Sequence, residues 1–262
     1  MENEQERGAF AIDDRIFLGE GLFETLKVVA GLPCCADLHW QRLAHAAHQL
    51  GIPFSLSFEQ WLARLQQQIK QDNLVEGGIK AILSAGAAPR GLAEYGTGTL
   101  LRLQTFRFRR TTQPLNVVRA PWLRDAANPV YQVKSINYLE AILARRHALA
   151  EGADDVLFFN LQQHATETSC ANLFLIHQHA LLTPPKTDGL LAGIMRARIL
   201  ALAKQQQISC NEVSLSQAMI EQADALFITN SLQGIRAIRT LEGINFPVSH
   251  PLLTHLCSSF CV

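Results

Sequence analysis

The chain has 262 residues, of which 48% are hydrophobic and 18% are charged, and its 23 Lys and Arg balance its 23 Asp and Glu. This much apolar surface excludes a disordered chain, and the zero net charge argues against a protein that neutralises many nucleic-acid phosphates. No apolar run approaches the ~20 residues that span a bilayer, and residues 1–7 (MENEQER) lack the hydrophobic core of a signal peptide. We therefore expect a cytoplasmic protein that binds neither membranes nor nucleic acid.

The six cysteines form no CxxC pair and are too sparse for a disulfide scaffold, so reduced, mostly structural thiols are expected. His177 and His179 are spaced i, i+2, but no HExxH motif or carboxylate cluster accompanies them. The sequence therefore predicts no metal site.

The first part of the chain predicts a mixed lobe of strands and two amphipathic helices. Asp37 is a plausible N-cap for the first helix, which Gly51 ends, and Ser57 with Gln60 forms a capping box for the second. The predicted strands cover 21–29, 79–84 and 99–108, and the predicted helices cover 38–50 and 58–69.

Residues 107–114 are charged and polar with a closing proline, which indicates an interdomain linker. Beyond it, strands are predicted at 117–121, 156–159, 172–176, 180–183, 225–229 and 235–238, and helices at 135–149, at 192–206 and after a Ser214/Gln217 capping box. Because strands and helices do not alternate regularly, we expect an α+β fold with two lobes, 1–109 and 110–262.

Among the few lysines, Lys134 stands out. Lys27 and Lys80 fall inside predicted strands, where an outward, solvated side chain is the default. Lys134 follows an extended stretch and immediately precedes the predicted 135–149 helix, so the helix dipole and partial burial would both lower its pKa. A neutral amine can attack a carbonyl and form a Schiff base, although a structural surface lysine is the alternative.

Several motifs occur around Lys134 in a fixed order: 14–15 (DR), 19–26 (GEGLFETL), 39–43 (HWQRL), 134–140 (KSINYLE), 166–174 (TETSCANLF), 193–196 (GIMR) and 229–232 (TNSL). This order resembles the fold-type IV family of pyridoxal-phosphate enzymes, which includes branched-chain and D-amino-acid aminotransferases and aminodeoxychorismate lyases. The resemblance implies pyridoxal 5′-phosphate as cofactor, a homodimer, a small N-terminal lobe, and a larger cofactor-binding lobe with a barrel-like sheet.

The resemblance also implies roles for individual residues. Lys134 matches the lysine that holds the cofactor aldehyde and moves the proton, and Glu167 matches the carboxylate facing the pyridine nitrogen. The residues matching the cofactor-phosphate site are Arg42, Gly193, Ile194, Met195 and Ser231, with Tyr138 near the ring oxygen. Without the resemblance, Glu167 is a solvated turn residue, Arg42 a surface arginine, Gly193 a flexible loop position and Tyr138 a core residue.

Within the family, residues 229–232 followed by Gly234 and Ile235, and the Arg90-Gly91 loop, are most similar to the aminodeoxychorismate lyases. This resemblance implies conversion of 4-amino-4-deoxychorismate to 4-aminobenzoate and pyruvate for folate synthesis, with Arg90 and Asn230 as candidate ligands of a substrate carboxylate. Two alternatives stay open. One is a branched-chain or D-amino-acid aminotransferase, and the other is a catalytically silent binding or dimerisation module.

Overall fold

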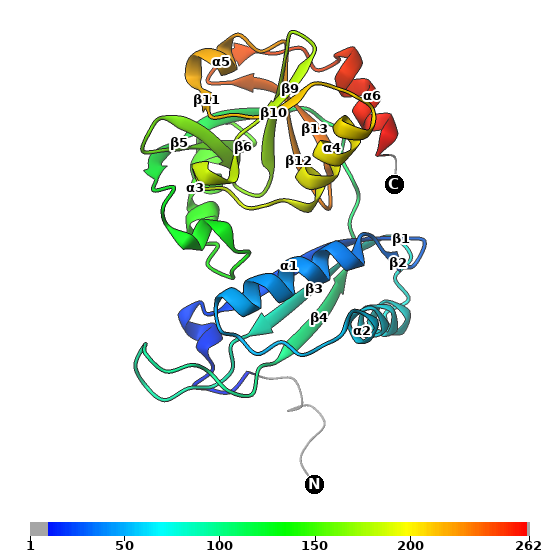
Figure 1. Ribbon diagram of the computed structural model, residues 1–262, viewed down its shortest axis with the longest axis vertical. Coiled ribbons are helices and arrows are strands. Elements are labelled where there is room, and N and C mark those ends of the chain that lie inside the picture. The colour runs from blue at the N-terminus through cyan, green and yellow to red at the C-terminus, as the bar shows by residue number, and fades with distance from the viewer. Residues whose placement is uncertain (1–9, 261–262) are drawn as a thin grey trace. The chain divides into compact units, whose positions relative to one another are not determined.

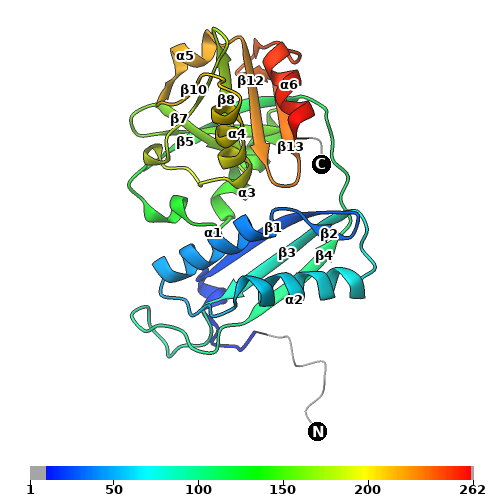
Figure 2. The same cartoon turned by 45° about the vertical axis from the view of Figure 1, so that its right-hand side comes forward.

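The computed structural model describes residues 10–260, so the signal-peptide prediction for residues 1–7 lies outside the described residues. The chain forms two compact units (Figures 1 and 2). The first unit runs to Arg109 and includes Lys134–Asn137, and the second comprises Arg110–Val133 and the chain from Tyr138 onward. The segment with Lys134, which the sequence analysis assigned to the lobe 110–262, therefore packs with the first unit.

The first unit is an antiparallel sheet with two helices on one face (Figure 2). The strand order is β2-β1-β3-β4, with β1 at Gly21–Val29, β2 at Leu32–Pro33, β3 at Gly77–Ser84 and β4 at Leu101–Phe106. The helices are α1 (Ala36–Gln49) and α2 (Phe58–Gln71), preceded in the chain by the short η1 (Arg15–Leu18). Trp61 of α2 is fully buried and donates its indole N–H to Ala36 of α1, which joins the two helices.

The second unit is built on a sheet that closes on itself. The strands of the ring follow one another as β8, β12, β13, β5, β6 and β7, and β7 returns to β8 through the pair Glu167 and Asn172. The strands are β5 (Leu115–Arg124), β6 (Asp155–Asn160), β7 (His164–Thr168), β8 (Asn172–His177), β9 (Ala180–Thr183), β10 (Cys210–Glu212), β11 (Leu215–Ser216), β12 (Ala225–Asn230), β13 (Gly234–Leu241) and β14 (Ile244–Asn245).

Helices surround this barrel. They are η2 (Pro129–Gln132), α3 (Leu139–Ala150), η3 (Lys186–Asp188), α4 (Ile194–Gln205), α5 (Gln217–Glu221) and α6 (Pro251–Ser259). Residues of α4 and α6 share a buried cluster with Phe174 and Phe227, whose rings stack at 5.1 Å, and α3 packs on Phe158. The alternating strand residues thus supply an apolar core on both sides of the barrel wall.

The predicted α+β fold, with a small sheet lobe and a larger barrel lobe, is confirmed. The capping box of Ser57 and Gln60 forms as predicted. In the part of the chain from 10 to 260, no helix has the length and apolar character needed to cross a membrane.

The predicted helix 135–149 begins too early, because α3 starts only at Leu139. Residues 134–136 instead lie extended along the edge of β1, where Ser135 pairs with Leu22. The argument that a helix dipole acts on Lys134 is therefore wrong, since no helix begins at the next residue.

Two predicted helix caps are also wrong. Cys35, with φ 51°, occupies the N-cap of α1, and Asp37 lies in the first turn of that helix. Ser214 donates its hydroxyl to Asp188, whereas Ser216 accepts from Met219 and caps α5. Both helices begin within one turn of the predicted position, which is the usual error of boundary prediction, and among the described residues no side chain caps α1.

Candidate active site

Lys134 is positioned by backbone pairing with β1. Phe23 donates its N–H to the Lys134 carbonyl at 3.0 Å, and Ile136 donates to Gly21 at 3.0 Å. The half-buried Lys134 side chain places its Nζ 4.2 Å from the centroid of the Phe23 ring. The backbone that follows Lys134 is thus fixed against β1 by main-chain bonds, and its side chain lies against Phe23.

A buried ionic cluster lies on β1 and α1 of the same unit. Arg42 donates its Nε to Oε1 of Glu24 at 2.7 Å and its Nη2 to Oε2 at 2.6 Å, a bidentate pair. Nδ1 of His39 lies 2.5 Å from Glu24 Oε2, and the side chains of Glu24 and His39 are each only 1% exposed. Arg42 is therefore not a surface arginine, because its guanidinium is fixed by a buried carboxylate.

The two acid–base groups of this cluster have shifted pKa values. Burial alone would raise the pKa of Glu24, but the charge and hydrogen bonds of Arg42, with those of His39, lower it to about 2. Burial lowers the pKa of His39 and outweighs the opposing bond from Glu24. At neutral pH the cluster therefore holds a carboxylate, a guanidinium and a neutral imidazole that donates to Glu24.

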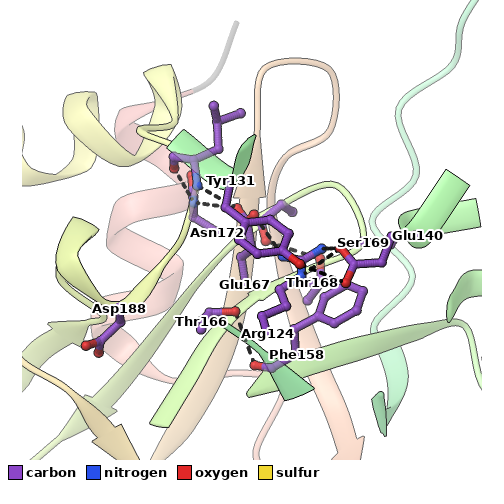
Figure 3. A network of polar contacts seen from close by, with 12 residues as sticks. Arg124, Tyr131, Glu140, Phe158, Thr166, Glu167, Thr168, Ser169, Asn172 and Asp188 are labelled. Carbon is purple, nitrogen blue, oxygen red and sulfur yellow. Dashed lines mark hydrogen bonds and ion pairs between the residues drawn. The ribbon is translucent and has the colours of Figure 1, made fainter. Parts of the chain in front are cut away.

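Glu167 lies at the centre of a polar network in the second unit (Figure 3). Arg124 donates to Glu167 Oε1 at 3.2 Å, and the Asn172 side-chain amide and the Leu191 N–H donate to Oε2 at 3.3 and 3.2 Å. The side chain of Glu167 is 14% exposed and extends from β7. The alternative of a solvated turn residue is therefore wrong, since three donors converge on one mostly buried carboxylate.

Arg124, at the end of β5, holds a second carboxylate as well. Its Nη2 lies 2.9 Å from Glu140 of α3, and its guanidinium carbon lies 3.4 Å from the centroid of the Phe158 ring. Tyr131 donates its hydroxyl to the same Glu140 at 3.2 Å (Figure 3). These contacts fix the guanidinium that faces Glu167, because it is held between two acids and an aromatic face.

Gly193 precedes the first turn of α4, where no side chain caps the helix. A Cβ at Gly193 would stand 1.8 Å from Asn172 Oδ1, so a larger residue there would force the Asn172 side chain to move. The amide of Asn172 also donates to Leu191 at 2.9 Å, besides its bond to Glu167. Asn172 thereby joins two predicted parts of the site, the carboxylate of Glu167 and the loop that opens α4 with Ile194 and Met195.

The predicted residues Asn230 and Ser231 lie at the turn between β12 and β13. The side-chain oxygen of Asn230 accepts from the N–H groups of Leu232 at 3.1 Å and Gln233 at 2.8 Å, and its amide donates to Cys170 at 3.3 Å. Asn230 therefore shapes the turn that presents the half-buried Ser231.

Two further predicted residues lie at the ends of segments. Tyr138 occupies the N-cap of α3 and is half-buried, so it is not in the core. Arg90 is exposed in the loop between β3 and β4, which Arg15 anchors by donating to Gly91 at 2.6 Å. In residues 10–260, no cluster of three or more His, Cys, Asp or Glu could hold a metal ion.

The predicted site residues thus come from both units. The first unit contributes Arg42, Arg90 and Lys134, and the second contributes Tyr138, Glu167, Gly193, Ile194, Met195, Asn230 and Ser231. The sequence reasoning missed Glu24, His39, Arg124 and Asn172. A signal for Glu24 was present, because an acid at an inward position of an alternating strand must have a partner.

Comparison with known proteins identifies the class of protein that carries these residues. Residues 21–241 match the amino-transferase class IV family, and the chain belongs to that family. A solved structure from Legionella pneumophila, of a protein for which 4-amino-4-deoxychorismate lyase activity has been proposed, is 54% identical, with a TM-score of 0.95 over 96% of this chain and 94% of that chain.

Two other relatives show both branches of the family. The 4-amino-4-deoxychorismate lyase structure from Pseudomonas aeruginosa is 26% identical, with a TM-score of 0.84 over 96% of this chain and 94% of that chain. The D-alanine aminotransferase of Bacillus licheniformis is 24% identical over 92% of this chain and 86% of its own length. The fold is therefore that of fold-type IV enzymes, and the family contains both lyases and aminotransferases.

Proposed function

We propose that the protein is a pyridoxal-phosphate-dependent lyase that converts 4-amino-4-deoxychorismate to 4-aminobenzoate and pyruvate in folate biosynthesis. The observation that carries this proposal is the 54% identity to the Legionella protein over nearly the whole of both chains. The aminotransferase relatives share about half that identity, which favours the lyase branch.

The class IV family uses pyridoxal 5′-phosphate, and the residues of this chain fit that cofactor. Arg42, held by Glu24, and the uncapped start of α4 supply donors suited to a phosphate dianion. Gly193 leaves Asn172 in place, because a side chain there would displace the Asn172 amide. When bound, the cofactor supplies an electron sink for the carbon next to the substrate amine.

Glu167 and Lys134 carry out the two tasks that the chemistry needs. The Glu167 carboxylate would accept a hydrogen bond from the protonated ring nitrogen of the cofactor and keep that nitrogen positively charged. Lys134 would bind the cofactor covalently, and its Nζ, once released, would remove the proton from the ring carbon that bears the substrate amine. The ether bond to the enolpyruvyl group then breaks, the leaving oxygen takes up a proton, and the ring becomes aromatic.

Arg90 is the residue we assign to a substrate carboxylate, because it is exposed on a loop that Arg15 fixes at its base. Asn230 is also proposed as a ligand of a substrate carboxylate through its amide nitrogen, since its oxygen is used by the turn. The resemblance to the family further supports a homodimer, which sedimentation velocity of the purified protein tests, and the cytoplasmic location stays a prediction from the sequence.

The experiment that tests the function is a product assay. The purified protein with pyridoxal phosphate is given 4-amino-4-deoxychorismate, and 4-aminobenzoate and pyruvate are measured in parallel. We expect equal amounts of both products, and none from the Lys134→Ala variant. Production of neither product, together with transfer of amine from D-alanine or a branched-chain amino acid to 2-oxoglutarate, would refute the lyase and support the aminotransferase. The absence of product in every assay would support a catalytically silent binding or dimerisation module.

A further inference from the structure

The sheet of the first unit has one face that carries cations. Directly paired residues of antiparallel strands lie on the same face, and alternate residues of one strand share that face. Thr25 pairs with Lys80, and Ile82 pairs both with Phe23 and with Arg102. Because Ser135 pairs with Leu22, its neighbour Lys134 lies on the same face as Phe23. The cations on this face are Lys27, Lys80, Arg102 and Lys134.

Lys80 and Lys134 flank one aromatic ring. Nζ of Lys80 lies 4.6 Å from the centroid of the Phe23 ring, and Nζ of Lys134 lies 4.2 Å from the same centroid. The two nitrogens are therefore within about 10 Å of each other, the Debye length at 0.1 M ionic strength. Lys80 is half-buried in β3, so the expectation of a solvated strand lysine is wrong. Burial and the charge of Lys134 both lower the pKa of Lys80.

The charged groups of the neighbouring strands of the first unit also bear on this pair. No Asp or Glu occupies this face in β1, β3, β4 or at residues 134 and 136. Asp14 reaches only the far end of the face, where it accepts from Ser84. Glu24 lies on the opposite face of β1, where Arg42 pairs with it bidentately and neutral His39 donates to it.

We propose that Lys80 is a positioning residue that lowers the proton affinity of the Lys134 amine through its charge, because the two amines lie only 4.6 and 4.2 Å from the Phe23 ring centroid. At ~10 Å and an effective dielectric constant of about 20, two unit charges shift one another's proton affinity by about one pKa unit, or tenfold in the protonation ratio. The charge of Lys80, and not a helix dipole, would then lower the pKa of Lys134. The role of Lys134 as the reacting amine rests on the proposed function. The electrostatic coupling between Lys80 and Lys134 does not depend on that function.

The test measures Lys134 directly in the protein without cofactor. The protein is labelled with trace acetic anhydride over a range of pH, and peptide mass spectrometry gives the extent of labelling at Lys134 and hence its pKa. We expect Lys80→Met and Lys80→Gln to raise that pKa by about one unit, because the repelling charge is gone. Lys80→Arg keeps a charge at the same strand position and serves as the matched control, with a Lys134 pKa close to that of the wild type.

A second readout uses the holoprotein, whose visible absorbance reports protonation at the Lys134 link to the cofactor. The midpoint of this pH titration should rise in Lys80→Met and remain at the wild-type value in Lys80→Arg. The proposal is overturned if Lys80→Met and Lys80→Gln leave the Lys134 pKa unchanged, or if Lys80→Arg shifts it as much as they do. A shift in the labelling experiment combined with no binding of pyridoxal phosphate would support the coupling and refute the proposed function, so the two failures are distinguishable.

Discussion

Glu24 is the residue whose removal tests the first unit most severely. Its pKa of about 2 lies well below the ordinary value of 4.5, because Arg42 and His39 outweigh the cost of burial. A carboxyl with a lowered pKa contributes stability that is fully present above its ordinary pKa and is lost as the pH falls through the folded-state value. At 1.36 kcal/mol for each pKa unit, this shift corresponds to about 3 kcal/mol at neutral pH.

The Glu24→Gln variant should therefore lose about 3 kcal/mol of unfolding free energy at neutral pH, which agrees with the ~3–5 kcal/mol cost of breaking a buried ion pair. Urea unfolding of the purified protein measures this. Glu20→Gln is the matched control, since Glu20 pairs with Arg15 at 3.3 Å but is 32% exposed. That exposed carboxylate should contribute less than about 1 kcal/mol.

The acid dependence gives an independent check. The wild type should lose stability as the pH falls from 4.5 toward 2, and Glu24→Gln should lack that component of the loss. A variant that is as stable as the wild type at neutral pH, or that retains the full acid sensitivity, would refute the reasoning on this cluster.

Three further changes probe the second unit. Gly193→Ala should cost about 1–3 kcal/mol in thermal unfolding through overpacking against Asn172; unchanged stability would show that the Asn172 side chain moves aside without cost. Glu167→Gln should lower lyase turnover at least about 100-fold, whereas unchanged turnover would place the carboxylate away from the cofactor nitrogen. Burial raises the pKa of Cys210 to about 11, so iodoacetamide should modify it far more slowly than the exposed Cys170 at neutral pH, and equal rates would contradict this.

The sequence pattern was sufficient to predict those elements whose structure depends on residues close to one another in the chain. The capping box of Ser57 and Gln60 satisfies its own backbone groups, and the strand 21–29 is recognisable from its β-branched and aromatic residues. The helix predicted at 192–206 forms as α4, with Gly193 at its N-cap. These features depend on residues within one or two turns of each other.

The parts that could not be predicted depend on distant partners. Residues 135 and 136 fall in the predicted helix, but pairing with β1, more than a hundred residues earlier in the chain, keeps them extended. The resemblance implied a barrel-like sheet, but the strand β7 and the pair Glu167 and Asn172 that closes it were not predicted, for the same reason. Arg124 could not be assigned to Glu167 from the sequence, because no short-range spacing relates β5 to β7.

The covalent link at Lys134 is the central claim, and one measurement tests it most directly. The purified holoprotein is reduced with borohydride and digested, and mass spectrometry locates the reduced pyridoxal-phosphate adduct among its six lysines. The account predicts the adduct on Lys134 alone, with none in the Lys134→Ala variant. An adduct on Lys80 or any other lysine of the wild type would contradict it.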